Sequence, residues 1–201
     1  MLKLYYSRYT RSSRPRWLLE EVGAPYELVR LDLRAGDHKH ESYLAIHPHG
    51  VVPALQDGDT TIYESVAICM YLADKLALGT LAPELGTPER ALWYQWMAYG
   101  LATLEPSVAQ YASHTRFLPE DQRVPAIAED AKGKARQAFA NLSRALAGRE
   151  HLLGGFTAAD VVIGSILLWA KSMKLVDEFP VLMAYADRLS RRPAWQAATR
   201  D

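Results

Sequence analysis

The sequence is short of the residues and runs that mark several protein classes. It has one cysteine, Cys69, in 201 residues, which excludes an internal disulfide framework and favours a reducing compartment. Its 23 basic and 23 acidic residues balance, so nothing in the net charge points to nucleic acid or an anionic membrane surface. No apolar run reaches ~18 residues, the minimum for a spanning helix, and the apolar start is too short for a signal peptide. We therefore expect a soluble cytoplasmic protein.

Metal and nucleotide motifs are also missing. There is no cysteine cluster and no His-x-x-x-His helix, and His47-Pro48-His49 has a rigid proline and no evident third ligand. The glycine patterns of phosphate-binding loops are absent too. We therefore expect neither a metal cofactor nor a nucleotide.

The first part of the chain alternates strand and helix patterns. The apolar spacing predicts strands at 2–6 and 26–31, helices at 12–22, 41–46 and 65–76, and a hairpin of strands 53–56 and 60–63. Asp57-Gly58 supplies the hairpin turn. The first strand, helix and second strand form a βαβ unit, which predicts a parallel strand pair.

Beyond a linker rich in proline and glycine, the pattern is entirely helical. Helices are predicted at 89–111, 127–146, 161–170, 180–189 and 193–198. Thr157 and Asp160 predict a capping box with Asp in place of the usual Glu, a structural role. The expected division is a first domain at 1–78, a linker at 79–87 and a helical domain at 88–201.

The most informative segment runs from Val52-Pro53, where the hairpin begins, to Glu64-Ser65, where the next helix begins. A proline inside an apolar strand run belongs at an edge, and a cis Val52-Pro53 bond would turn the Val52 backbone groups outward to pair with a guest peptide. Ser65 begins a helix whose free N–H groups favour a carboxylate, and Glu64 beside it can hold an ammonium. Together these features suit an extended zwitterionic peptide.

With these motifs, the chain resembles the cytosolic glutathione S-transferase family over nearly its whole length. The resemblance rests on Val52-Pro53, on Glu64-Ser65 and on Phe156-Thr157-Ala158-Ala159-Asp160. The stretches at 17–21 and 46–50 look most like a bacterial and fungal branch, with theta- and beta-like features. The resemblance implies a thioredoxin-like N-terminal domain of order βαβαββα, followed by an all-helical domain.

The same resemblance implies roles for individual residues. The Val52 backbone pairs with the cysteinyl unit of glutathione, with Val51 and Pro53 beside it. Glu64 and Ser65 take the γ-glutamyl ammonium and carboxylate, and His38 is the candidate for the glycyl carboxylate. Gly50-Val51 stand where many relatives place Lys or Gln, so recognition of that carboxylate is expected to be weaker or supplied elsewhere.

Catalysis in this family means holding the glutathione sulfur as a thiolate, because the thiolate attacks an electrophile. A hydroxyl, a cation and a helix N-terminus can each favour the anion, and the segment 9–14 offers all three. Thr10 ranks first as the hydroxyl, Ser12 second and Tyr9 third, and Arg11 is a candidate glutathione contact. For Ser12 and Ser13 the alternative is helix N-capping.

Three further residues have structural interpretations. Arg14 and Arg16 are expected to be solvated or ion-paired, and Cys69 to be a small core residue.

The predicted function is a glutathione transferase acting on a small hydrophobic electrophile. Glutathione-dependent peroxide or disulfide reduction, and a non-catalytic glutathione-binding module, remain alternatives. The resemblance also implies a homodimer. Some of Tyr99, Leu104, Tyr111 and Phe117 are expected to line the electrophile cleft.

Overall fold

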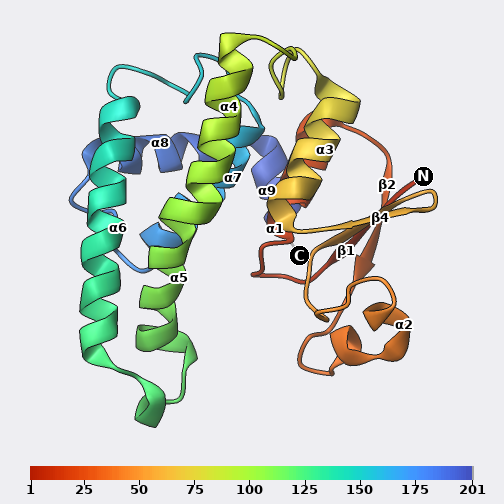
Figure 1. Ribbon diagram of the computed structural model, residues 1–201, viewed down its shortest axis with the longest axis horizontal. Helices are drawn as coiled ribbons and strands as arrows, with labels where there is room; N and C mark the ends of the chain where they lie inside the picture. The colour runs from red at the N-terminus through yellow and green to blue at the C-terminus, as the bar shows by residue number, and fades with distance from the viewer. Residues whose placement is uncertain (201) are drawn as a thin grey trace. The chain divides into compact units, whose positions relative to one another are not determined.

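The computed structural model describes residues 1–200, which divide into two compact units. One unit is Met1–Ala82 together with the C-terminal segment from Arg191, and the other is Pro83–Ser190 (Figure 1). The predicted order βαβαββα followed by helices is confirmed. No helix within residues 1–200 has both the length and the apolar character needed to cross a membrane.

The first unit is built on a four-stranded mixed sheet. Its elements are β1 (Leu2–Tyr6), α1 (Ser13–Val22), β2 (Tyr26–Arg30), the short 3-10 turn η1 (Asp37–Lys39), α2 (Glu41–Leu44), β3 (Ala54–Asp57), β4 (Thr60–Tyr63) and α3 (Ser65–Ala77). The strand order is β2-β1-β3-β4. β1 pairs with β2 in parallel, as predicted, whereas the β1–β3 and β3–β4 pairs are antiparallel.

Alternation along β1 explains how helices cover both faces of this sheet. Successive side chains of a strand point to opposite faces. Tyr6 lies beneath Arg16 of α1, with the guanidinium carbon 4.8 Å from the ring centre. Tyr5 faces the other way and packs against Tyr43 of α2, with ring centres 5.4 Å apart. The sheet therefore lies between α1 on one face and α2 on the other.

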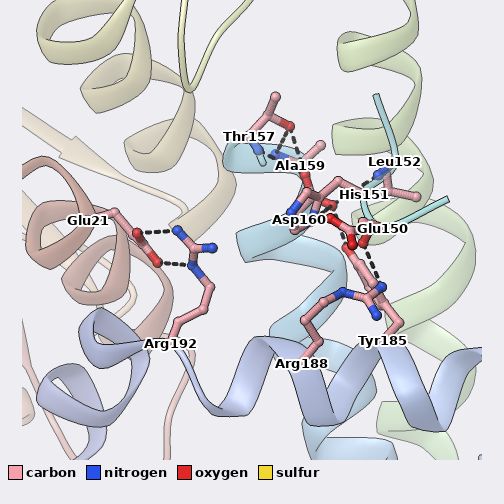
Figure 2. Close-up of polar contacts among 10 residues, drawn as sticks. All are labelled: Glu21, Glu150, His151, Leu152, Thr157, Ala159, Asp160, Tyr185, Arg188 and Arg192. Atoms are coloured by element: carbon pink, nitrogen blue, oxygen red, sulfur yellow. Dashed lines mark hydrogen bonds and ion pairs between the residues drawn. The ribbon is translucent and has the colours of Figure 1, made fainter. Parts of the chain in front are cut away.

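The last helix, α9 (Pro193–Thr199), belongs to this first unit. Trp195 packs edge-on against Trp17 of α1, with ring centres 4.8 Å apart. Glu21 accepts a hydrogen bond from Trp17 Nε1 at 2.8 Å. It also accepts from Nε and Nη2 of Arg192, at 2.5 and 2.7 Å (Figure 2). These contacts explain why the chain from Arg191 onward groups with residues 1–82 and not with the expected domain 88–201.

The second unit is helical throughout. Its elements are α4 (Pro88–Tyr99), the π-helical turn η2 (Gly100–Leu104), α5 (Glu105–Ala112), the π-helical turn η3 (Ser113–Phe117), the 3-10 turn η4 (Glu120–Gln122), α6 (Pro125–Ala145), α7 (Ala158–Ser172) and α8 (Pro180–Ser190). The predicted helix at 89–111 is thus interrupted by η2. A Cβ on Gly100 would lie 2.9 Å from Val162 Cγ1, so this turn packs closely against α7 and a side chain here would force Val162 to shift.

The predicted capping box is present at the start of α7. Asp160 is fully buried, and its Oδ2 accepts from the Thr157 N–H at 2.8 Å and from the Thr157 hydroxyl at 3.1 Å. Its Oδ1 accepts from the Leu152 N–H at 3.1 Å and from the Tyr185 hydroxyl at 2.7 Å (Figure 2). Burial, together with Asp160, raises the pKa of Tyr185 well above its usual range. One carboxylate therefore joins α7, α8 and the preceding loop.

Candidate functional site

The turn between β4 and α3 has the features predicted for an anion site. Glu64 stands just before the helix with φ 75°, a left-handed conformation that is uncommon for any residue except glycine. Its side chain is exposed and makes no capping hydrogen bond. Ser65, the first residue of α3, is buried. The unpaired N–H groups of a helix start and an exposed carboxylate therefore lie next to one another.

The chain before β3 presents a backbone edge. The Val52-Pro53 bond is cis, as the sequence predicted. Within residues 1–200 no hydrogen bond engages the N–H or C=O of Val52. The Val51 carbonyl, by contrast, accepts from the Tyr43 hydroxyl at 2.6 Å, and burial raises the pKa of Tyr43. The Val51 carbonyl is therefore occupied, whereas the N–H and C=O of Val52 are both left open by the described residues.

The loop between β1 and α1 is held by Ser12. This side chain is fully buried, donates to the Ser7 carbonyl at 2.9 Å and accepts from the Ser7 N–H at 3.1 Å. It makes no capping hydrogen bond to α1, so the capping alternative for Ser12 is wrong. Ser13 does not cap α1 either, since it is the first residue of the helix and its hydroxyl donates backward to the Thr10 carbonyl at 3.0 Å.

Thr10 has the more accessible hydroxyl of the two leading candidates. It is partly exposed, and its Oγ1 lies 2.6 Å from both the Ser7 carbonyl oxygen and Ser12 Oγ. Two hydroxyl protons are shared among these three oxygens. If Ser12 donates to Thr10, the Thr10 proton is left for an outside acceptor.

Tyr9 and Arg11 stand on either side of Thr10 in the sequence, and both are exposed. Tyr9 has φ 61° and 88% of its surface in solvent, and the Arg8 guanidinium lies 4.5 Å from the centre of its ring. No hydrogen bond within residues 1–200 involves the Tyr9 hydroxyl. The Tyr9 ring is therefore in contact with the Arg8 cation, and no hydrogen bond from the described part of the chain orients its hydroxyl.

The His38 loop meets the chain just before Val52 through a glycine. Gly50 has φ 55°, and a Cβ there would lie 2.6 Å from the His38 carbonyl oxygen, so only glycine fits. The Nδ1 atom of His38 is buried without a hydrogen-bond partner among residues 1–200. Lys39 Nζ donates to the Gly50 carbonyl at 3.2 Å. This cation, which sequence reasoning missed, lies where the chain lacks the expected Lys or Gln; its position directly after His38 was the available signal.

Contacts between side chains join these segments. Arg14 of α1 donates from Nη1 to Ser65 Oγ at 3.2 Å. His47 and Tyr63 pack with ring centres 4.8 Å apart, which brings the chain before Val52 to the residue before Glu64. Burial, with a smaller contribution from His49, lowers the pKa of His47, and Glu64 opposes this. Three segments far apart in the sequence thus meet at the start of α3.

Several other predicted residues have clear positions. Arg14 and Arg16 are both buried, so the expectation that they are solvated is wrong. Cys69 is a buried core residue, as predicted, and burial raises its pKa to about 12. Leu104 is fully buried in the second unit, which removes it from the expected cleft lining, whereas Phe117 is exposed.

Metal chemistry has no visible site in the part of the chain that the structure covers. Within residues 1–200, no three His, Cys, Asp or Glu side chains gather as metal ligands.

Comparison with known proteins identifies the family. Residues 1–74 match the model for the glutathione S-transferase N-terminal domain. The probable glutathione S-transferase GSTF2 of Oryza sativa is 32% identical, over 89% of this chain and 86% of that protein. Glutathione S-transferase F9 of Arabidopsis thaliana is 29% identical, over 98% and 95%.

A solved structure agrees with this match. The glutathione transferase URE2P6 of Phanerochaete chrysosporium, in complex with oxidized glutathione, superposes with a TM-score of 0.88 at 28% identity, over 99% of this chain and 94% of that one. The two sequence relatives come from plants, so the bacterial branch with theta- and beta-like features is not supported. The predicted fold and the predicted glutathione transferase are confirmed, and the chain belongs to the glutathione S-transferase family.

Proposed function

We propose that this chain binds glutathione in extended form across the start of α3 and activates its sulfur as the thiolate, which attacks a small hydrophobic electrophile and displaces its leaving group. The observation that carries the proposal is the meeting of three segments, those of Thr10, Val52 and Ser65, through the Arg14–Ser65 and His47–Tyr63 contacts. Each segment offers a different group: a hydroxyl, an open peptide edge and a helix N-terminus. These three groups match the thiol, peptide plane and carboxylate of glutathione.

At the γ-glutamyl end, the Glu64 carboxylate holds the ammonium, and the Ser65 hydroxyl with the first N–H groups of α3 holds the carboxylate. The open Val52 peptide group pairs with the cysteinyl unit, and the cis Pro53 bond and Val51 shape this edge. The bond from Tyr43 to the Val51 carbonyl supports the assignment, because it occupies that carbonyl and leaves the N–H and C=O of Val52 for the peptide.

At the glycyl end, His38 and Lys39 receive the second carboxylate. The open Nδ1 of His38 supports a polar contact there, and the Lys39 ammonium supplies the cation. Lys39 thus takes the place of the Lys or Gln that Gly50 and Val51 do not provide.

Thr10 is the hydroxyl proposed to donate to the sulfur and stabilise the thiolate. The Oγ of the buried Ser12 lies 2.6 Å from Thr10 Oγ1, so Ser12 can turn its proton from the Ser7 carbonyl to Thr10 when Thr10 donates to sulfur. Ser12 therefore positions the Thr10 proton and does not touch sulfur. The exposed Tyr9 stays third, and the exposed Arg11 adds positive charge beside the anion.

Turnover of a chlorinated nitrobenzene with glutathione tests this assignment. We expect Thr10→Val, which removes the hydroxyl at nearly constant volume, to lower kcat/KM by about 10²-fold or more, as loss of one transition-state donor does. Ser13→Ala, at the first residue of α1 directly after this loop, is the matched control and should retain activity within about threefold. Wild-type turnover in Thr10→Val would remove Thr10 from the mechanism.

Conjugation is favoured over a reductase reaction that passes through an enzyme disulfide. Such a reaction needs an accessible cysteine thiolate, and Cys69 is buried with its pKa raised to about 12. Parallel assays with cumene hydroperoxide and with a chlorinated nitrobenzene separate conjugation from reduction by glutathione itself.

We also propose that the chain forms a homodimer through α4. Tyr94 and Leu101 lie seven positions apart on α4 and the following turn, so they share a helix face, and 42% and 44% of their surface is exposed. Exposed apolar groups gathered on one element mark interaction surfaces. Light scattering should give twice the chain mass, and Tyr94→Glu together with Leu101→Glu should give the monomer.

A further inference from the structure

Arg14 and Ser65 form a buried contact inside the proposed site. Only 3% of Arg14 and 5% of Ser65 is exposed, and Arg14 Nη1 donates to Ser65 Oγ at 3.2 Å. The two residues are 51 positions apart, on α1 and at the first position of α3. The bond thus connects the helix after the Thr10 loop with the helix that begins at the anion site.

The chemistry of this pair fixes the direction of the Ser65 proton. A guanidinium donates and never accepts, whereas a hydroxyl has one proton and two acceptor lone pairs. The bond from Arg14 therefore occupies a lone pair of Ser65 and leaves its proton free. Within residues 1–200 no acceptor takes that proton.

A second serine in a helix shows the ordinary alternative. The Ser107 hydroxyl donates to the Leu104 carbonyl, three residues earlier, at 2.9 Å. Ser65 has no helical turn before it, because α3 begins at this residue. Its proton is therefore free both of the local backbone and of Arg14.

We propose that Arg14 is a positioning residue that holds Ser65 as a hydrogen-bond donor toward the γ-glutamyl carboxylate. The inference rests on the proposed function, which places that carboxylate at the start of α3. A donor bond from a buried cation polarises the Ser65 hydroxyl, which strengthens its own donation to the anion. Arg14 thus acts on glutathione through Ser65 and does not contact it.

A double-mutant cycle on glutathione affinity, measured by calorimetry, tests the proposal. Arg14→Met and Ser65→Ala should each weaken binding by about tenfold, the usual effect of losing a hydrogen bond that involves a charge. In the Ser65→Ala background, Arg14→Met should change affinity by less than about twofold. Arg16→Met is the matched control, since Arg16 is also a buried arginine of α1 but lies over Tyr6. It should bind glutathione like the wild type.

Two results would overturn the inference while leaving the proposed function intact. One is full additivity, in which Arg14→Met still costs about tenfold without Ser65. The other is unchanged affinity in Arg14→Met. A wild-type protein that does not bind glutathione would instead overturn the proposed function and this inference with it.

Two milder variants keep the test available if Arg14→Met fails to fold, as judged by circular dichroism. Arg14→Lys retains a group that only donates, so it should keep affinity within about threefold. Arg14→Gln introduces an amide oxygen that can accept the Ser65 proton, so it should lose affinity about tenfold. Equal affinities for the two variants would contradict the proposal.

Discussion

The first turns of α3 and α7 are the same structural element used in opposite ways. At α7 the Thr157 hydroxyl accepts from the Ala159 N–H at 3.3 Å, and the carboxylate of the buried Asp160 accepts from the Thr157 N–H. At α3 the preceding residue, Glu64, makes no capping bond and holds a left-handed backbone. A helix start that satisfies its own N–H groups contributes to stability, whereas one left open is available to a ligand.

The largest effect is expected where the helix start is closed. Asp160→Ala would leave the Leu152 and Thr157 N–H groups and the Tyr185 hydroxyl buried without an acceptor, and should lower the free energy of unfolding by about 3–5 kcal/mol. Denaturation with urea measures this. Asp177→Ala, at an exposed aspartate, is the control and should change it by less than about 0.5 kcal/mol. A loss below about 1 kcal/mol in Asp160→Ala would show that the cluster is not structural.

Thr157→Ala should have a smaller effect of the same sign. It removes the capping oxygen but leaves the Asp160 bond to the backbone, so the expected loss is about 1 kcal/mol. Thr157→Ser keeps the hydroxyl and should restore most of this stability. An effect as large as that of Asp160→Ala would mean that the two residues act only as a unit.

Glu64→Gly should raise the free energy of unfolding, whereas the two variants at α7 lower it, because at α3 stability and function are opposed. Glycine accepts φ 75° without a steric penalty, so the free energy of unfolding should rise by up to about 1 kcal/mol. Glutathione binding should fall, since the carboxylate for the ammonium is gone. Glu64→Ala should lose binding without this gain in stability. Equal stability in the two variants would argue against backbone strain at this turn.

The smallest effect is the pH dependence of stability that arises from His47, which packs against Tyr63 next to this turn. The folded pKa of His47 lies below its unfolded value of 6.5, so the unfolded chain takes up the proton first. The contribution of neutral His47 to stability is therefore present above pH 6.5 and is lost as the pH falls below it. In His47→Asn the urea midpoint should drop less between pH 7.5 and 5.5 than in the wild type. His40→Asn, at an exposed histidine, should leave the drop unchanged.

Sequence reasoning succeeded where the determining contacts are local. The capping box follows from two residues three positions apart. The cis Val52-Pro53 bond and the helix start at Ser65 follow from strand, turn and helix signals close to them in the sequence. The role of Asp160 in holding Tyr185 was not predictable, because the two residues are 25 positions apart and meet only after the helices pack.

The reactive loop was harder to predict for the same reason. Sequence alone ranked Thr10 above Ser12, but the burial of Ser12 depends on how the loop closes back on Ser7. Arg14 looked like an ordinary charged helix residue, since nothing nearby in the sequence shows that Ser65 lies against it. The placement of α9 beside α1 depends likewise on Trp195 and Glu21, which lie at opposite ends of the chain.

The most direct test of the account is a calorimetric titration of glutathione into the wild type and into Ser65→Ala, with urea denaturation of both. We predict binding by the wild type, affinity lower by about tenfold in Ser65→Ala, and a free energy of unfolding that differs by less than about 1 kcal/mol. Equal affinity in the two proteins, or a loss of affinity that merely follows a loss of stability, would contradict the claim that the open start of α3 is the binding site.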